Sequence, residues 1–311
     1  MLQTPNQTVV FLMGPTASGK TNLAIQLADT FKARIISVDS ALIYKGMDIG
    51  TAKPDKTILE KYPHHLINIC NPEDTYSAFD FMRDANKQIE TAFKNGETPI
   101  LVGGTSFYFN ALEHGLSNLP ESTKASKEKF NQLLHDKSSA ILHKDLKKID
   151  PQAANRIHPN DSQRITRALE VFELSGKTLS ELQGNKQPSI NHPIKKIILM
   201  PKRAELHKRI EARFLSMLEN GFLEEVKTLK QNPNLHENLP SIRCVGYRQA
   251  WQYLNGEISK TDLIEKAIIA TRQLCKRQST WLRNEENALV LATNNIKTTL
   301  QFIKPCAHLS S

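Results

Sequence analysis

One short segment, Gly14-Pro15-Thr16-Ala17-Ser18-Gly19-Lys20-Thr21, constrains this chain more than any other. It matches GxxxxGK[ST] at every fixed position and lies between an expected strand at 8–13 and an expected helix at 21–31. In that context the glycines let the backbone curl around an anion, the helix N-terminus adds partial positive charge, and Lys20 adds a full charge. The Thr21 hydroxyl suits a Mg²⁺ ligand. We therefore predict a P-loop that binds a pyrophosphate group.

Short apolar runs alternate with amphipathic stretches along much of the chain. Further strands are expected at residues 34–38, 66–70, 99–102, 196–200 and 288–292, and a second helix at 78–94. Such alternation implies right-handed crossovers and a parallel sheet covered by helices. The predicted fold class is α/β, with a core of the P-loop nucleoside triphosphate hydrolase type.

A different pattern occupies residues 120–190. Residues 121–148 are polar, rich in Lys and Ser, and helical in period, and residues 150–176 carry the apolar stripe Ile165, Leu169 and Phe172. A polar loop at 184–193 then leads back to strand character. We expect a core domain of residues 1–119 and 191–311 and a mainly helical insertion domain of residues 120–190.

Charge and composition narrow the functional class. The chain has 41 Lys plus Arg residues and 32 Asp plus Glu residues, which give a formal charge of +9. This excess either indicates a polyanionic partner or forms an ordinary solvated basic surface, and clustering of the charge favours the partner. The mean hydropathy of −0.42 and the lack of an apolar run of ~20 residues exclude a membrane span. The N-terminus lacks the features of a signal peptide, and the four cysteines are far apart. We expect a cytoplasmic monomer without a disulfide framework or zinc site.

Two polar residues follow expected strands, where ligands collect in an open parallel sheet. Asp39 follows residues 34–38, where it either holds Mg²⁺ through water, accepts a proton from a nucleophile, or caps a turn. Thr105 follows Gly103-Gly104, where its hydroxyl donates to a phosphate or leaving-group oxygen, caps a helix, or does both. We expect both residues to face the P-loop across one crevice.

Three basic clusters favour a nucleic acid. In the expected helix 263–283, Leu263, Ala267, Ala270, Leu274 and Trp281 share one face, and Arg272, Lys276 and Arg283 lie opposite. Residues 243–248 (RCVGYR) place an aromatic ring between two arginines, a combination that can stack a base, and residues 163–167 (QRITR) form the third cluster. His64-His65 is interpreted as structural, because adjacent strand residues point to opposite faces.

Together these motifs closely resemble those of the tRNA dimethylallyltransferases. The resemblance rests on GPTASGKT, SVDS at 37–40, YKGMDIGTAKP at 44–54, VGGT at 102–105, QRITR, RCVGYR and KRQSTWLR at 276–283, and it runs from about residue 9 to 292. Lys127 departs from the family pattern, which often has Arg near that position, because lysine keeps the charge but loses the bidentate fork.

The resemblance implies transfer of a dimethylallyl group from dimethylallyl diphosphate to the N6 amine of adenosine 37, immediately 3′ of the anticodon, in tRNAs that read codons starting with U. Diphosphate would leave from the P-loop, Gly14 to Thr21, with Mg²⁺ as cofactor on Thr21 and with Lys20 and Arg213 neutralising charge. Thr105 would donate to the bridging oxygen, and Asp39 would take the amine proton. The implied partners are the tRNA anticodon stem-loop and dimethylallyl diphosphate.

The target base must also leave the loop stack to react. The resemblance implies tRNA contacts by Asp39, Ser40, Ala41, Leu42, Thr105, Lys127, Gln163, Arg164, Ile165, Thr166, Arg167, Arg243, Cys244, Val245, Gly246, Tyr247, Arg248, Lys276, Arg277, Gln278, Ser279, Thr280, Trp281, Leu282 and Arg283. Two rival interpretations stand beside it: a P-loop kinase of a nucleoside or small metabolite, and a non-catalytic RNA-binding protein with a nucleotide-gated P-loop.

Overall fold

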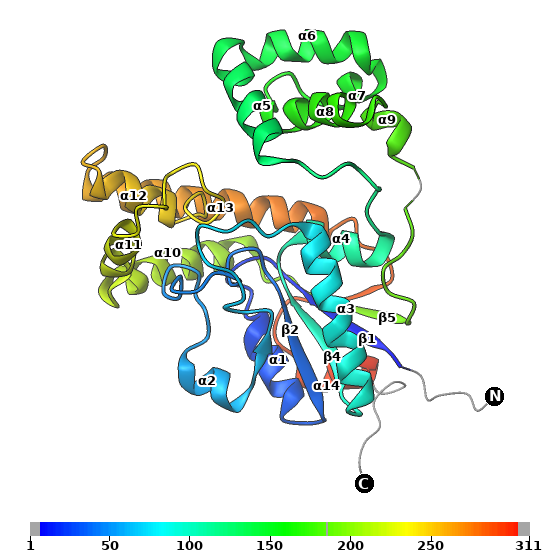
Figure 1. Cartoon of the computed structure of the whole chain (residues 1–311). Helices are drawn as coiled ribbons and strands as arrows, with labels where there is room; N and C mark the ends of the chain where they lie inside the picture. Colours follow the sequence, from blue (N-terminus) through cyan, green and yellow to red (C-terminus); the bar gives the residue numbers. More distant parts are fainter. Residues whose placement is uncertain (1–6, 185, 304–311) are drawn as a thin grey trace, which may run out of the picture. The chain divides into compact units, whose positions relative to one another are not determined.

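The computed structural model describes residues 7–184 and 186–303, without the side chains of Lys124 and Lys127. The chain forms two compact units, of which the first comprises Met1–Leu112 and Ile190–Ser311 and the second Glu113–Ser189 (Figure 1). Each unit has its own apolar core. In the part of the chain described, no helix is both long and apolar enough to cross a membrane.

A parallel sheet forms the centre of the first unit. Its strands run in the order β3-β2-β4-β1-β5-β6, and their bounds are Val9–Met13 (β1), Ala33–Val38 (β2), His64–His65 (β3), Thr98–Gly103 (β4), Ile194–Leu199 (β5) and Ala288–Leu291 (β6). Every pairing in it is parallel. The central strand β1, VVFLM, is buried along its whole length, as expected for a sheet covered on both faces. The predicted α/β class is confirmed.

Helices cover both faces of this sheet (Figure 1). Alternate residues of β1 point to opposite faces, so that Val10 and Leu12 pack with α1 (Lys20–Ala28) and α14 (Ile296–Ile303). Phe11 and Met13 pack on the other side with α3 (Ala78–Lys94) and α4 (Ser106–His114). The predicted helix at 78–94 has the same bounds as α3.

The register of the sheet brings three strand ends together. Met13 of β1 and Val38 of β2 both pair with Gly103 of β4. Gly103 must be glycine, because a Cβ there would lie 2.0 Å from the carbonyl oxygen of Val38. The loops that follow β1, β2 and β4 therefore begin side by side at one edge of the sheet.

Four further helices of the first unit pack around an aromatic cluster. They are α10 (Arg203–Glu219), α11 (Phe222–Lys230), α12 (Tyr247–Leu254) and α13 (Lys260–Leu282), while the short α2 spans Lys56–Lys61. The rings of Phe214 and Tyr247 both meet Phe222 edge-on, with centroids 6.1 and 5.1 Å away. This cluster also buries Ile43, Tyr44 and Met47, and so fixes the segment that follows β2.

The second unit is helical throughout its regular structure. Its helices are α5 (Lys124–Asp136), α6 (Ser139–Ile149), α7 (Pro151–Arg156), α8 (Ser162–Ser175) and α9 (Leu179–Leu182). Asp150 caps α7 by accepting the Ala153 N–H, with Pro151 at the first helical position, and α8 ends at the left-handed Gly176. The core includes Ile165 and Leu169 of the predicted stripe, whereas Phe172 is one of the exposed large apolar side chains.

The prediction of a strand at 66–70 is wrong. The strand is β3, two residues long, in which His64 pairs with Ile35 and His65 with Ile36. Leu66 and Asn68 have left-handed φ values of 64° and 57°, which break an extended chain. An isolated bridge between Tyr44 and Cys70 is all that remains of strand pairing there.

Candidate functional site

A cavity of about 780 Å³ opens at the C-terminal ends of β1, β2 and β4. Its walls come from the P-loop, the residues after β2 and β4, helices α10 and α13, and the segment 240–247, all within the first unit. Asp39, Thr105, Lys20 and Thr21 all line it, as the positions of Asp39 and Thr105 after strands predict. The structure thus brings the predicted catalytic residues into one space.

The P-loop backbone is curled tightly beneath this cavity. A Cβ on Gly14 would lie 2.6 Å from Ser18 Oγ and 2.8 Å from the Leu199 carbonyl oxygen, so that position requires glycine. Ala17 and Gly19 both have positive φ, at 63° and 93°. Helix α1 then begins at Lys20 with no side-chain cap, which leaves its first amides available to an anion.

Two cations face the space above the loop. Burial lowers the pKa of Lys20 to about 8, an effect that Asp39 opposes and Arg213 strengthens, and its Nζ donates to Pro15 O at 3.3 Å. Burial, with Arg209 nearby, also lowers the pKa of Arg213, although its side chain still reaches the open cavity. The two cations repel each other, and a bound anion would relieve that repulsion.

Arg209 supports the P-loop from α10, and sequence reasoning missed it. Its Nη1 donates to the carbonyl oxygens of Ala17 at 3.3 Å and Ser18 at 3.2 Å, and its Nη2 pairs with Glu205. Arg209 and Arg213 are four residues apart on one helix and therefore share a face. That spacing was the signal in the sequence that could have found it.

Gln278 links α13 to the same loop. Its Oε1 accepts the Thr16 N–H at 2.9 Å, and its Nε2 donates to the Gly104 carbonyl at 2.9 Å. The Thr16 N–H and the Ser18 N–H, which donates to Pro15 O at 3.2 Å, are thus already used within the protein. These two loop amides are therefore not free to bind a phosphate.

The carboxylate of Asp39 is held by its own turn. Its Oδ1 accepts the N–H groups of Ala41 at 2.8 Å and Leu42 at 3.3 Å, and among the described residues no hydrogen bond engages Oδ2. The Thr105 hydroxyl accepts the Ser40 N–H at 3.2 Å, so its own hydrogen remains free to be donated. The turn-cap and functional interpretations of Asp39 are therefore compatible.

The aromatic ring of the RCVGYR segment is not accessible to a base. Tyr247 is fully buried, and its hydroxyl donates to Glu225 at 2.5 Å. The hypothesis that this ring stacks a base is therefore wrong, because the ring is packed against Phe222. Arg243 and Arg248 are exposed, and Cys244 and Val245 are partly exposed. Gly246, with a φ of 91°, is the N-cap of α12.

Helix α13 has a different buried face from the one predicted. Its interior positions include Leu263 and Ala267, as expected, but continue through Cys275, Ser279 and Leu282, whereas Ala270, Leu274 and Trp281 are only partly buried. The exposed residues of the predicted tRNA-binding segment are Lys276, Arg277, Thr280 and Arg283. Arg272 pairs with Glu211 of α10 at 2.8 Å, so its charge is already compensated.

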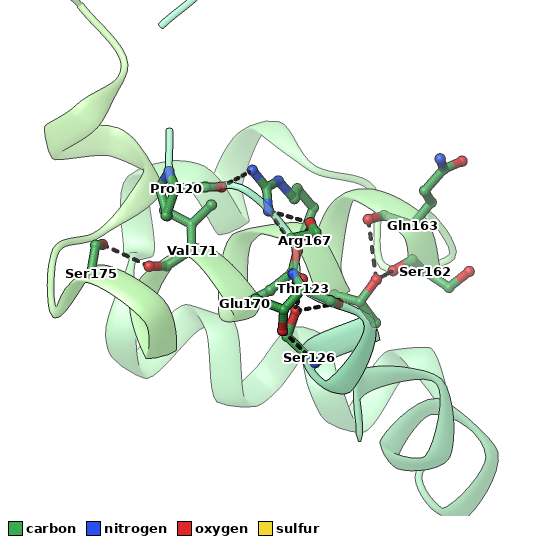
Figure 2. Close-up of polar contacts among 11 residues, drawn as sticks. Pro120, Thr123, Ser126, Ser162, Gln163, Arg167, Glu170, Val171 and Ser175 are labelled. Carbon is green, nitrogen blue, oxygen red and sulfur yellow. Dashed lines mark hydrogen bonds and ion pairs between the residues drawn. The ribbon is translucent and has the colours of Figure 1, made fainter. Parts of the chain in front are cut away.

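In the second unit, some of the QRITR residues are exposed and others are buried. Gln163 and Arg164 are exposed, Thr166 is partly buried and donates to Ser162 O, and Ile165 is fully buried in the core. Figure 2 shows that Arg167 turns into a polar network, where it donates to Glu170 at 2.6 Å and to the Pro120 carbonyl at 2.7 Å. The Lys127 side chain lies outside the described residues.

Glu170 is the centre of this network. Its carboxylate accepts hydrogen bonds from Ser126 at 2.5 Å and from Arg167 (Figure 2). It also accepts one from Ser122 at 2.7 Å. Burial alone would raise the pKa of Glu170, but these donors hold it below its ordinary value. The network ties the start of α5 to α8 and so fixes the fold of the second unit.

Comparisons with known proteins find a matching family model and a similar tRNA-modifying enzyme. The family model described as IPP transferase matches residues 42–285. A tRNA dimethylallyltransferase of Vesicomyosocius okutanii is 75% identical over 298 residues, which are 96% of this chain and 98% of that protein.

Solved structures give the same result. The full-length tRNA isopentenylpyrophosphate transferase of Bacillus halodurans is 33% identical, with a TM-score of 0.70 and 96% of each chain covered. A eukaryotic dimethylallyltransferase, described as acting on tRNA, is 28% identical, with a TM-score of 0.79, and the match covers 98% of this chain and 81% of that one.

Proposed function

Because this chain belongs to the IPP transferase family, we propose that it transfers a dimethylallyl group from dimethylallyl diphosphate to the N6 amine of adenosine 37 in tRNAs that read codons starting with U. One observation supports the proposal: the cationic residues of the P-loop site and the Asp39 carboxylate, held by its own turn, line the same cavity. A kinase can also combine a phosphate site with a carboxylate base, so the family match decides between the two reactions. We expect the protein to act as a monomer in the cytoplasm, where tRNA is found.

The phosphate side of the cavity assists departure of the leaving group. The allylic C–O bond breaks, its electron pair leaves with diphosphate, and Lys20 and Arg213 stabilise the added charge. The Thr105 hydroxyl, whose hydrogen is free, donates to the bridging oxygen. Arg209 and Gln278 contribute by holding the loop in the curled form that places Lys20.

The carboxylate side assists the nucleophile. The N6 lone pair is delocalised into the adenine ring, so a hydrogen bond from the amine to Asp39 raises its electron density. As N6 forms the new bond to carbon, its proton passes to Asp39 Oδ2. Oδ1 already accepts two backbone N–H groups, which hold the carboxylate in position throughout this step.

Mg²⁺ fits the donors of this cavity as an ion carried in with the substrate. Thr21 offers a hydroxyl beside Lys20, and within the described residues no group of three or more His, Cys, Asp or Glu side chains is close enough to hold a metal alone. Mg²⁺ is commonly bound by one or two protein oxygens together with substrate phosphates and water. Thr21 would hold the ion, which would supply further charge neutralisation to diphosphate.

In each unit, the exposed basic residues of the predicted tRNA-binding segments are the proposed contacts to tRNA. In the first unit they are Arg243, Arg248, Lys276, Arg277 and Arg283, of which Arg243 and Arg277 also line the cavity. In the second unit Arg164 is exposed beside Gln163. Such residues neutralise phosphates of the anticodon stem-loop and recover part of the cost of extruding adenosine 37.

A transfer assay tests the proposed reaction. Purified protein, Mg²⁺ and dimethylallyl diphosphate labelled in the allyl group are mixed with an unmodified tRNA that carries adenosine 3′ of its anticodon. We expect label in that tRNA and none in the same tRNA with guanosine at this position. ATP-dependent phosphorylation of a small acceptor, without transfer of label to RNA, would instead favour the kinase. RNA binding without either reaction would favour a non-catalytic binding protein.

A further inference from the structure

We propose that Phe107 is a stacking platform for an unstacked nucleobase of the tRNA at the mouth of the cavity. This inference deepens the proposed function and rests on it. The ligand is the π-face of a base, either the extruded adenine or a base next to it in the anticodon loop. Stacking on an aromatic ring is a common way in which proteins hold unpaired bases.

Exposure singles out this residue. Phe107 is 60% exposed, and of the large hydrophobic side chains that are exposed in the described part of the chain it is the one that also lines the cavity. The other aromatic rings of the cavity wall, Phe214 and Tyr247, are buried and packed against Phe222. A base that enters the cavity therefore finds one accessible ring.

The fold does not need an aromatic ring at this position. Helix α4 packs on the sheet through Tyr108, Phe109 and Leu112, which are all buried. Phe11 meets Phe109, and Phe81 stacks on Tyr108 with ring centroids 4.2 Å apart. Phe107 lies outside that packing, in the first turn of the helix.

The position also suits the proposed chemistry. Phe107 comes two residues after Thr105, whose hydroxyl accepts the Ser40 N–H. Residues 105–107 line the cavity together with Asp39 and Ser40. A base whose amine reaches Asp39 would occupy the cavity that this stretch lines, where the Phe107 ring can support that base or its neighbour.

The first experiment measures binding of an unmodified anticodon stem-loop hairpin to the full-length protein by filter retention. Phe107→Ala should weaken binding about 10-fold to 100-fold, the range for loss of one base stack, and Phe107→Tyr should retain it. Affinity for dimethylallyl diphosphate should be unchanged in both. Phe79→Ala is the matched control, because Phe79 is 48% exposed on α3 but does not line the cavity, and it should bind like the wild type.

The second experiment identifies the base by repeating these measurements on hairpins that carry one abasic nucleotide. If Phe107 stacks on the extruded adenine, the penalty of Phe107→Ala disappears when that nucleotide is abasic. If it stacks on a neighbour, the penalty disappears when the neighbour is abasic. An equal penalty on every hairpin, or none on the intact one, would overturn the proposal. Failure of the wild type to bind any hairpin would remove both the proposed function and this role.

Discussion

The side-chain oxygen of Gln278 accepts a hydrogen bond from the Thr16 N–H at 2.9 Å and thereby ties α13 to the P-loop. The same side chain donates to Gly104 O at 2.9 Å, and a Cβ on Gly104 would lie 2.5 Å from its Nε2. One amide therefore fixes the spacing between the phosphate loop and the end of β4. Gln278 lies among the basic residues of α13. This helix therefore connects the proposed tRNA contacts to the proposed diphosphate site.

We predict that Gln278→Ala weakens binding of dimethylallyl diphosphate by about tenfold to 100-fold. Two backbone groups lose their partners, at a cost of ~1–3 kcal/mol. The affinity for tRNA should change by less than the affinity for diphosphate, which titration calorimetry and filter binding compare. Gln273→Ala, at an exposed position of the same helix, is the control and should leave both affinities unchanged. A larger loss for tRNA than for diphosphate would show that Gln278 acts mainly as an RNA contact.

Diphosphate affinity should decrease as the pH rises through about 8. Burial lowers the pKa of Lys20 to about 8, so above that pH the unbound site loses its ammonium charge, and binding must take up a proton. The decrease should approach about tenfold per pH unit well above the pKa. Lys20→Arg keeps its charge over this range and should show a flat profile, even with weaker binding overall. Equal slopes for the two proteins, measured between pH 7 and 9.5, would contradict the assignment.

Arg164 and Arg167 should have separable roles. Arg167→Ala removes the cationic partner of the buried Glu170, which keeps only its two serine donors, and should destabilise the second unit by about 2 kcal/mol. Arg164→Ala should change stability by less than ~0.5 kcal/mol. Arg164→Ala should instead weaken tRNA binding and reduce its salt slope by about 1. Thermal unfolding and salt-dependent filter binding separate the two effects. The reverse pattern would mean that the network is dispensable and that Arg167 reaches the RNA.

The basic residues of α13 should differ in their effect on salt dependence. Lys276 is exposed, so Lys276→Ala should lower the slope of log K against log salt by about 1. Arg272 is already paired with Glu211, so Arg272→Ala should lower it by less. Binding of one stem-loop between 50 and 300 mM salt measures both. If Arg272→Ala has the larger effect, the ion pair must open when RNA binds.

The elements that the sequence predicted well are those where local pattern and tertiary packing agree. The P-loop, α3 and the residues after β2 and β4 follow from short-range signals, namely glycine spacing, helical period and strand ends. The failed strand at 66–70 shows the limit of such signals. Leu66 and Asn68 adopt left-handed backbone conformations that apolar composition does not reveal.

The side-chain partners could not be predicted, because they join segments far apart in the chain. Thr16 and Gln278 are separated by 262 residues, and Tyr247 is turned inward by a ring and a carboxylate of α11. A motif indicates which residue types occur together, but not which of them face the cavity. The family resemblance identified the segments expected to contact the substrates. Tertiary packing determines which side chains in those segments are accessible to them.

The most direct test of the central claim is the single-turnover rate of label transfer by Asp39→Asn, with tRNA saturating. Asparagine can still accept the Ala41 and Leu42 N–H groups but cannot take a proton from the amine. The account predicts a loss of roughly 10²-fold to 10⁴-fold in the rate, with stem-loop and diphosphate affinities close to those of the wild type. A rate within about threefold of the wild type would contradict it, because the carboxylate facing the P-loop would then have no part in the chemistry.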